Sequence, residues 1–181
     1  MLFTDLLRAT VLLVAGVGTF LAAVAIATAS QDGDATAIVV GVGWWAIAVA
    51  IGLWLGRSTA AGESMRRVLA GARTATSLPA ETPGRIAFLR LWPIAAFALV
   101  AAGVAWAWPQ VAAIGAGYSI LVALAWRHRE AAVSAIEERD GVRFYVDASS
   151  AFEPVRLIRT PGLYRDRLPV AKPPPPPPAT G

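Results

Sequence analysis

Three long stretches without a charged residue constrain this chain more than any other feature of its sequence. Residues 9–31, 35–56 and 91–126 contain no Asp, Glu, Lys or Arg over 23, 22 and 36 positions. A helix needs about 20 apolar residues to cross a hydrocarbon core that is about 30 Å thick. The first two stretches therefore predict one membrane-spanning helix each, over about residues 9–30 and 35–56.

The third stretch is too long for a single crossing. As one helix it would extend about 54 Å at 1.5 Å per residue, well beyond the hydrocarbon core. Its middle holds Trp108-Pro109-Gln110, and a proline lacks an amide donor and disfavours helix in the residue before it. We therefore predict a tight turn there and two spans, about 91–108 and 109–126. The predicted fold is an all-α integral membrane protein with four transmembrane helices arranged as two tandem hairpins.

The composition of the chain agrees with a membrane protein. Hydrophobic residues make up 56% of the 181 positions and charged residues 15%, against about 45–50% and about 25% in soluble proteins. The chain contains no Cys, so disulfides and thiolate metal sites are excluded.

The charges beside the spans predict the orientation of the chain. The connection between the second and third spans, residues 57–90, is rich in arginine: Arg57, Arg66, Arg67, Arg73, Arg85 and Arg90. The connection after the first span has only Asp32 and Asp34. By the positive-inside rule the Arg-rich loop and both termini are cytoplasmic, in a bacterial-type plasma membrane. The same rule accounts for the net charge of +4, so nucleic acid is not a predicted partner.

The first apolar stretch has a second interpretation, as a cleaved signal peptide. Ala27-Thr28-Ala29 before Ser30 has the small residues of a cleavage site. The stretch is longer than the usual apolar region of about 7–15 residues, and Asp5 offsets the positive charge of Arg8. A retained span is therefore favoured; cleavage would leave three spans.

Two similar glycine-aromatic segments suggest that the hairpins are duplicated. Gly41-Val42-Gly43-Trp44 and Gly115-Ala116-Gly117-Tyr118 occupy the middle of the second and fourth spans. One interpretation is a pocket at the membrane midplane; the other, which we favour, is close helix packing at small residues. The candidate residues are Gly41, Gly43, Trp44, Trp45, Gly115, Gly117 and Tyr118. The GxxxG spacing of Gly52 and Gly56 likewise indicates a close helix contact.

Residues 64–73 of the Arg-rich loop have helical spacing of their apolar side chains, which predicts a short helix on the membrane surface. Membrane lipid is then a predicted partner, and the candidate contacts to anionic headgroups are Arg66, Arg67 and Arg73. The alternative is a solvated loop.

Residues 127–168 predict a helical extension of the fourth span to about Arg139, followed by a cytoplasmic β-hairpin of residues 142–147 and 155–159. A two-stranded hairpin is only marginally stable alone, so its apolar side chains need another surface: a protein partner, a second copy, the chain's own loop or the headgroups. The candidate docking residues are Phe144, Val146, Leu157 and Ile158. Residues 169–181 predict a disordered Pro-rich tail whose six consecutive prolines favour polyproline II.

No set of residues predicts catalysis, a metal site or a cofactor. The single histidine, His128, lies between two arginines, and no carboxylate pair or nucleophile motif accompanies it. We therefore expect a non-enzymatic membrane subunit or scaffold that docks a partner through its cytoplasmic tail. The alternative is a small homo-oligomeric permease for an uncharged or lipophilic substrate, since the spans have no ionisable residue for ion coupling.

Overall fold

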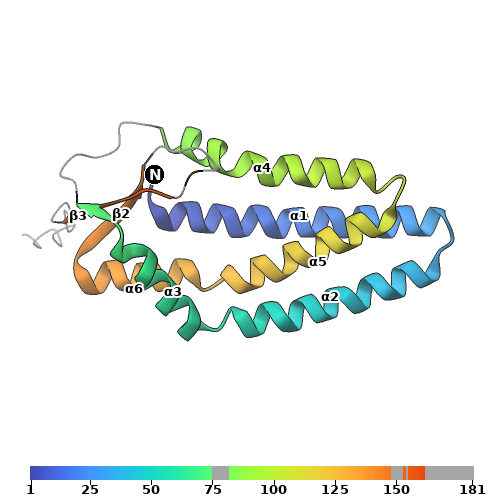
Figure 1. Ribbon diagram of the computed structural model, residues 1–181, viewed down its shortest axis with the longest axis horizontal. Coiled ribbons are helices and arrows are strands. Elements are labelled where there is room, and N and C mark those ends of the chain that lie inside the picture. The colour runs from blue at the N-terminus through green and yellow to red at the C-terminus, as the bar shows by residue number, and fades with distance from the viewer. Residues whose placement is uncertain (75–81, 148–152, 154, 162–181) are drawn as a thin grey trace, which may run out of the picture.

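The computed structural model describes residues 1–74, 82–147, 153 and 155–161, and it is mostly helical (Figure 1). Four helices in it are long and apolar enough to cross a membrane. They are α1 (Phe3–Gln31), α2 (Ala35–Leu55), α4 (Pro83–Val104) and α5 (Pro109–Trp126). The prediction of four candidate spans is confirmed.

Some helix boundaries differ from the predicted spans. Helix α1 begins at Phe3 instead of residue 9, and α4 runs from Pro83 to Val104 instead of 91–108. Charged residues end the apolar stretch but do not end a helix, so both helices continue past Arg8 and Arg90. Proline in the first turn suits a helix start because its φ is already fixed near the helical value. The turn at Trp108 and Pro109 is where it was predicted.

The four long helices run alternately up and down, with α5 between α1 and α2 (Figure 1). The most extensive helix contacts are those of α5 with α1 and with α2, while α4 packs on both α1 and α5. The interface between α1, α4 and α5 is built largely from small side chains, which let helix backbones approach closely. Its buried members are Val17, Leu21, Ala25, Ala98, Ala101, Ala105, Ala112 and Ala116.

The GxxxG pair of α2 lies against α5. A Cβ added to Gly52 would lie 2.9 Å from the Leu124 Cβ and 3.0 Å from the Leu121 carbonyl oxygen. Gly56 lies against the carbonyl oxygen of Leu124. The predicted close contact is therefore present, and it joins two helices of the same chain.

A small domain closes one end of the helices, which we call the domain end (Figure 1). It contains α3 (Ser58–Ala70), α6 (Arg129–Asp140) and the strands β1 (Arg73–Thr74), β2 (Val142–Val146) and β3 (Leu157–Pro161). Strands β2 and β3 pair antiparallel, as predicted, while β1 pairs parallel to β3 and was not predicted. The opposite end, with the turns at residues 32–34 and 105–108, is the turn end.

Chain segments far apart in sequence meet in the domain. Leu2 forms a bridge with Tyr145, and the Val146 amide donates to the Met1 carbonyl at 3.0 Å. Helix α6 ends at Gly141, whose φ of 61° is a left-handed conformation that glycine adopts at low cost. The last helical residue, Asp140, is one position beyond the predicted Arg139. Most of the predicted connection between the two strands, and the Pro-rich tail, lie outside the described residues.

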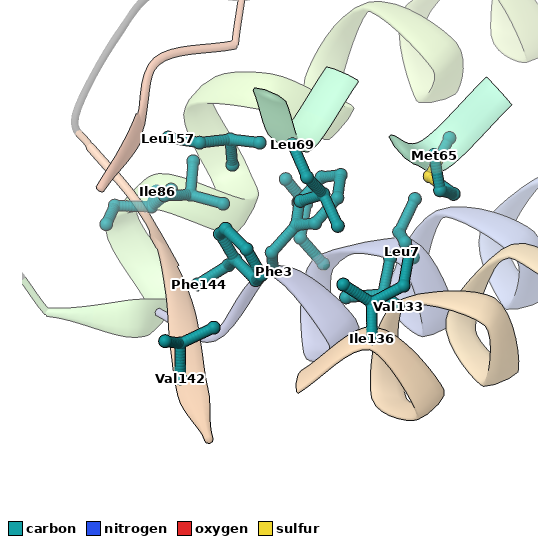
Figure 2. Close-up of a cluster of buried hydrophobic side chains, with 12 residues drawn as sticks. Phe3, Leu7, Met65, Leu69, Ile86, Val133, Ile136, Val142, Phe144 and Leu157 are labelled. Atoms are coloured by element: carbon teal, nitrogen blue, oxygen red, sulfur yellow. The ribbon is translucent and has the colours of Figure 1, made fainter. Parts of the chain in front are cut away.

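The domain has one apolar core, to which the start of α1, α3, α4, α6, β2 and β3 all contribute (Figure 2). Val133 and Val146 are fully buried in it, and Ile86 of α4 is 1% exposed. The core therefore fixes α3, α6 and the sheet to the ends of α1 and α4. Its buried members are Phe3, Leu6, Leu7, Met65, Leu69, Ile86, Val133, Ile136, Val142, Phe144, Val146 and Leu157.

The α2–α5 contact can be tested with two alanine substitutions in the same helix. Gly52→Ala places a methyl group against Leu121 and Leu124, and overpacking of this kind costs about 1–3 kcal/mol. Gly43→Ala is the matched control, because a Cβ there meets nothing within 4 Å. Thermal unfolding in detergent should show a lower midpoint for Gly52→Ala and an unchanged or higher one for Gly43→Ala. Equal midpoints would contradict this contact.

Candidate functional site

The aromatic residues predicted at the midplane come together between α2 and α5. The Trp45 indole Nε1 donates to the Ala113 carbonyl at 2.9 Å, and the Trp44 Nε1 donates to the Ile114 carbonyl at 3.4 Å. The rings of Trp44 and Tyr118 lie edge to face, with centroids 5.5 Å apart. Both indoles therefore bind the α5 backbone, and they fix the middle of α2 to the second turn of α5.

The four glycines that were predicted near the midplane have different surroundings. Gly117 lies directly against the Trp44 indole, where a Cβ would overlap the ring, and a Cβ at Gly115 would lie 3.0 Å from the Leu21 Cδ1. A Cβ added to Gly41 would lie 3.7 Å from the Ala113 Cβ. Gly115 and Gly117 therefore lie in close helix contacts, Gly41 makes an ordinary van der Waals contact, and Gly43 is exposed and faces no neighbouring helix.

A groove of about 390 Å³ lies beside these aromatics, between α1, α2 and α5. We call it the turn-end groove, because Trp44 and Trp45 line one end of it and Asp34, at the turn end, lines the other. Its volume is within the range of about 300–1,000 Å³ that is usual for small-molecule sites. Its walls include Ile26, Ala29, Val40, Ala113 and Ile114.

Apart from the two indoles, the polar side chains that line the turn-end groove come from the starts of α2 and α5. They are Asp34 and Thr36 from the start of α2 and Gln110 from the start of α5. The Asp34 Oδ1 accepts a hydrogen bond from the Ala37 amide at 3.0 Å and so caps α2. The groove therefore combines a long apolar wall with one polar, acidic mouth. The sequence pointed to Trp44 and Trp45 but gave no sign that a cavity extends from them to the turn end.

The candidate docking residues of the hairpin lie inside the domain. Phe144 is 3% exposed, Val146 is fully buried and Leu157 is 5% exposed, while Ile158 is half-buried. Figure 2 shows Phe144 among Phe3, Ile86 and Leu157. The surface that the hairpin needs is thus supplied by the chain itself, which was one of the alternatives left open by the sequence.

The three candidate headgroup arginines lie on two different elements. Arg66 and Arg67 are exposed on α3, whose Met65 and Leu69 face the domain core. Arg73 is also exposed, but it begins β1, opposite Ile158 of β3. The predicted helix over residues 64–73 is therefore wrong at its end, because α3 stops at Ala70 and Gly71 follows. The apolar side of α3 packs on protein.

A buried carboxylate, Glu137 of α6, holds the domain together and was not predicted. Its side chain is 3% exposed; the Phe144 amide donates to its Oε1 at 2.9 Å, and the Arg143 Nη1 lies 3.4 Å from its Oε2. Burial raises the pKa of Glu137, and the Phe144 hydrogen bond and the Arg143 charge oppose that shift. The spacing of Val133, Ile136 and Glu137 on one helix face was the available signal.

Within residues 1–74, 82–147, 153 and 155–161, no group of three or more His, Asp or Glu side chains could hold a metal ion. The only histidine, His128, accepts from the Arg127 Nε at 2.9 Å at the start of α6. Comparisons with protein-family models, with curated proteins and with solved structures find no match to this chain. The function must therefore be inferred from the residues of this chain.

Glu137 predicts a pH-dependent stability of the domain. Its folded pKa is raised, so its contribution is fully present below the unfolded pKa of about 4.3 and is lost as the pH rises through the folded value. Glu137→Gln removes the buried charge and keeps an acceptor for the Phe144 amide. Thermal unfolding from pH 4 to pH 8 should show the wild-type midpoint falling relative to that of Glu137→Gln.

Glu137→Ala is the companion variant. It leaves the buried Phe144 amide without this acceptor, which costs about 1–3 kcal/mol. We expect it to be less stable than Glu137→Gln at every pH. A wild-type midpoint that runs parallel to that of Glu137→Gln across this range would show that Glu137 does not titrate differently in the two states.

Proposed function

We propose that this chain is a non-enzymatic, multi-pass subunit or scaffold of a bacterial-type plasma membrane, which presents a cytoplasmic tail to a protein partner. The observation that carries the proposal is the closed domain at one end of the spans. Its core joins the start of α1 to α3, α4, α6 and the sheet, and β3 ends at Pro161, before the Pro-rich tail. Residues 162–181 therefore directly follow strand β3, which is fixed by the domain core.

The proposed orientation places the domain end in the cytoplasm. This end holds the arginines of α3 and α6 and of the connections beside them, whereas the described turns at residues 32–34 and 105–108 hold Asp32 and Asp34 and no basic residue. Positive charge beside the spans favours the cytoplasmic side. Helix α1 lies against α2, α4 and α5, which supports its retention as a span instead of its removal as a signal peptide.

The orientation can be tested by labelling, since the chain has no cysteine of its own. Ala107 is exposed at the turn end, and Ala135 is exposed on α6. In intact cells, a membrane-impermeant maleimide should label an Ala107→Cys variant, while Ala135→Cys should react only after the membrane is permeabilised. The reverse pattern would place the domain end outside.

The proposed docking site is the tail of the chain, and the burial of the hairpin supports this choice. Phe144, Val146 and Leu157 are buried in the domain core, so we assign docking to residues 162–181, where the six prolines lie. Pro-rich segments bind aromatic-lined grooves because their extended conformation is already ordered. The exposed Arg66 and Arg67 of α3 would hold the domain against anionic headgroups, a contact worth about 1 kcal/mol for each arginine.

Deleting residues 162–181 tests the docking role of the tail, because this truncation keeps every element of the described fold. We expect a stoichiometric partner to copurify with the full chain from native membranes in mild detergent and to be lost on truncation. Thermal unfolding should be unchanged. The matched control keeps the length of the tail and replaces Pro173–Pro178 with Gly and Ser. A partner retained by the truncated chain would contradict this role.

A lipophilic permease is the second proposal, and the turn-end groove is the observation that favours it. The groove ends at Trp44 and Trp45, about halfway along α2. Beyond it Gly52 and Gly56 press α2 against α5. The groove therefore supports binding of a lipophilic molecule from one side more strongly than passage across the membrane.

A further inference from the structure

The length and direction of the turn-end groove correspond to one leaflet of a bilayer. It follows α2 from Asp34 to Trp45, and eleven residues of helix extend about 16 Å at 1.5 Å per residue. Half of a hydrocarbon core of about 30 Å is about 15 Å. A ligand that fills the groove would thus reach from the membrane surface to the midplane, as the acyl chain of a lipid does.

The deep end of the turn-end groove has no unsatisfied indole donor for a ligand. The N–H groups of Trp44 and Trp45 both donate to carbonyl groups of α5. The two side chains therefore offer ring surface in place of hydrogen bonds. Such an end accepts hydrocarbon, since a polar ligand atom placed there would lose its hydration without a new partner.

The side of the groove is open to the membrane. Ile26, Val40 and Ile114 line it and are 45%, 65% and 51% exposed. These three side chains would face lipid in a bilayer. An acyl chain can therefore enter sideways from the surrounding leaflet, without passing through water.

The negative charge at the mouth of the groove favours some lipid headgroups over others. Asp34 lines the mouth and Asp32 is close to it in the same turn, while the described turn end has no Lys or Arg. Two carboxylates repel an anionic headgroup and attract an ammonium group. Gln110, also at the mouth, adds an amide that can donate to a phosphate oxygen.

We propose that the turn-end groove binds one phosphatidylethanolamine molecule, with an acyl chain along α2 and the ammonium group at Asp34. The site depends neither on partner docking by the tail nor on transport. Under the proposed orientation the lipid belongs to the outer leaflet.

Native mass spectrometry of the full chain in detergent tests this site. Phosphatidylethanolamine, its N-acetylated form and phosphatidylglycerol would be titrated separately, with identical acyl chains. We expect one phosphatidylethanolamine per chain, bound roughly two- to fivefold more tightly than the other two lipids, as for an exposed charge pair. Asp34→Asn should remove this preference while α2 stays capped, because asparagine is an equally good N-cap residue.

A second pair of variants tests the position of the acyl chain. Ala37 lines the groove, whereas Ala46 is exposed on the same helix outside it. We expect Ala37→Phe to weaken phosphatidylethanolamine binding about tenfold by filling the groove, as overpacking does in a protein interior. Ala46→Phe adds the same ring and should leave binding unchanged.

Three results would overturn the proposal. Equal affinity for all three lipids, unaffected by Asp34→Asn, would show that the mouth of the groove does not discriminate between headgroups. Equal binding by the Ala37→Phe and Ala46→Phe variants would place the lipid elsewhere. A two-chain species that excludes the lipid would assign the groove to a helix of a second copy.

Discussion

The contact of α5 with both α1 and α2 is the interaction on which the rest of the structure depends. It is made where side chains are small or absent: Gly52 and Gly56 on α2, and Gly115 and Gly117 on α5. Lipid gives helices no hydrophobic reason to associate, so close backbone approach has to supply the attraction. The indoles of Trp44 and Trp45 then fix the contact by donating to α5 carbonyls. The turn-end groove begins where this close contact ends.

The domain end follows a different physical rule, because its core must exclude water. Phe3, Val133 and Phe144 come from segments far apart in sequence and are buried together. Closing this core also buries backbone groups. One of them, the Phe144 amide, donates a hydrogen bond to the Glu137 carboxylate. The carboxylate is costly to bury as a charge but satisfies a donor that would otherwise lose its partner. The same residue therefore stabilises the domain and makes its stability depend on pH.

Much of the helical part of this fold could be predicted from sequence, because a bilayer leaves few alternatives. The uncharged runs predicted the four candidate spans, and Pro109 predicted the turn between the last two. Which helices touch could not be predicted, since Ala, Gly and Val occur on every face of the spans. Strand β1 was missed because two residues carry no periodicity, and only its pairing with β3 reveals it. Glu137 was missed because its partner, Phe144, lies on another element. The duplicated two-span unit remains a prediction of the sequence.

The pairing of Leu2 with Tyr145 has a consequence for the order in which the protein forms. Contacts between distant parts of a chain can form only after the intervening chain has been made, and they close slowly. During synthesis α1 is made long before β2 exists. Phe3, Leu6 and Leu7 then remain without their core partners until the last elements arrive. The core of the domain end can therefore close only after every element from α1 to β3 has been made.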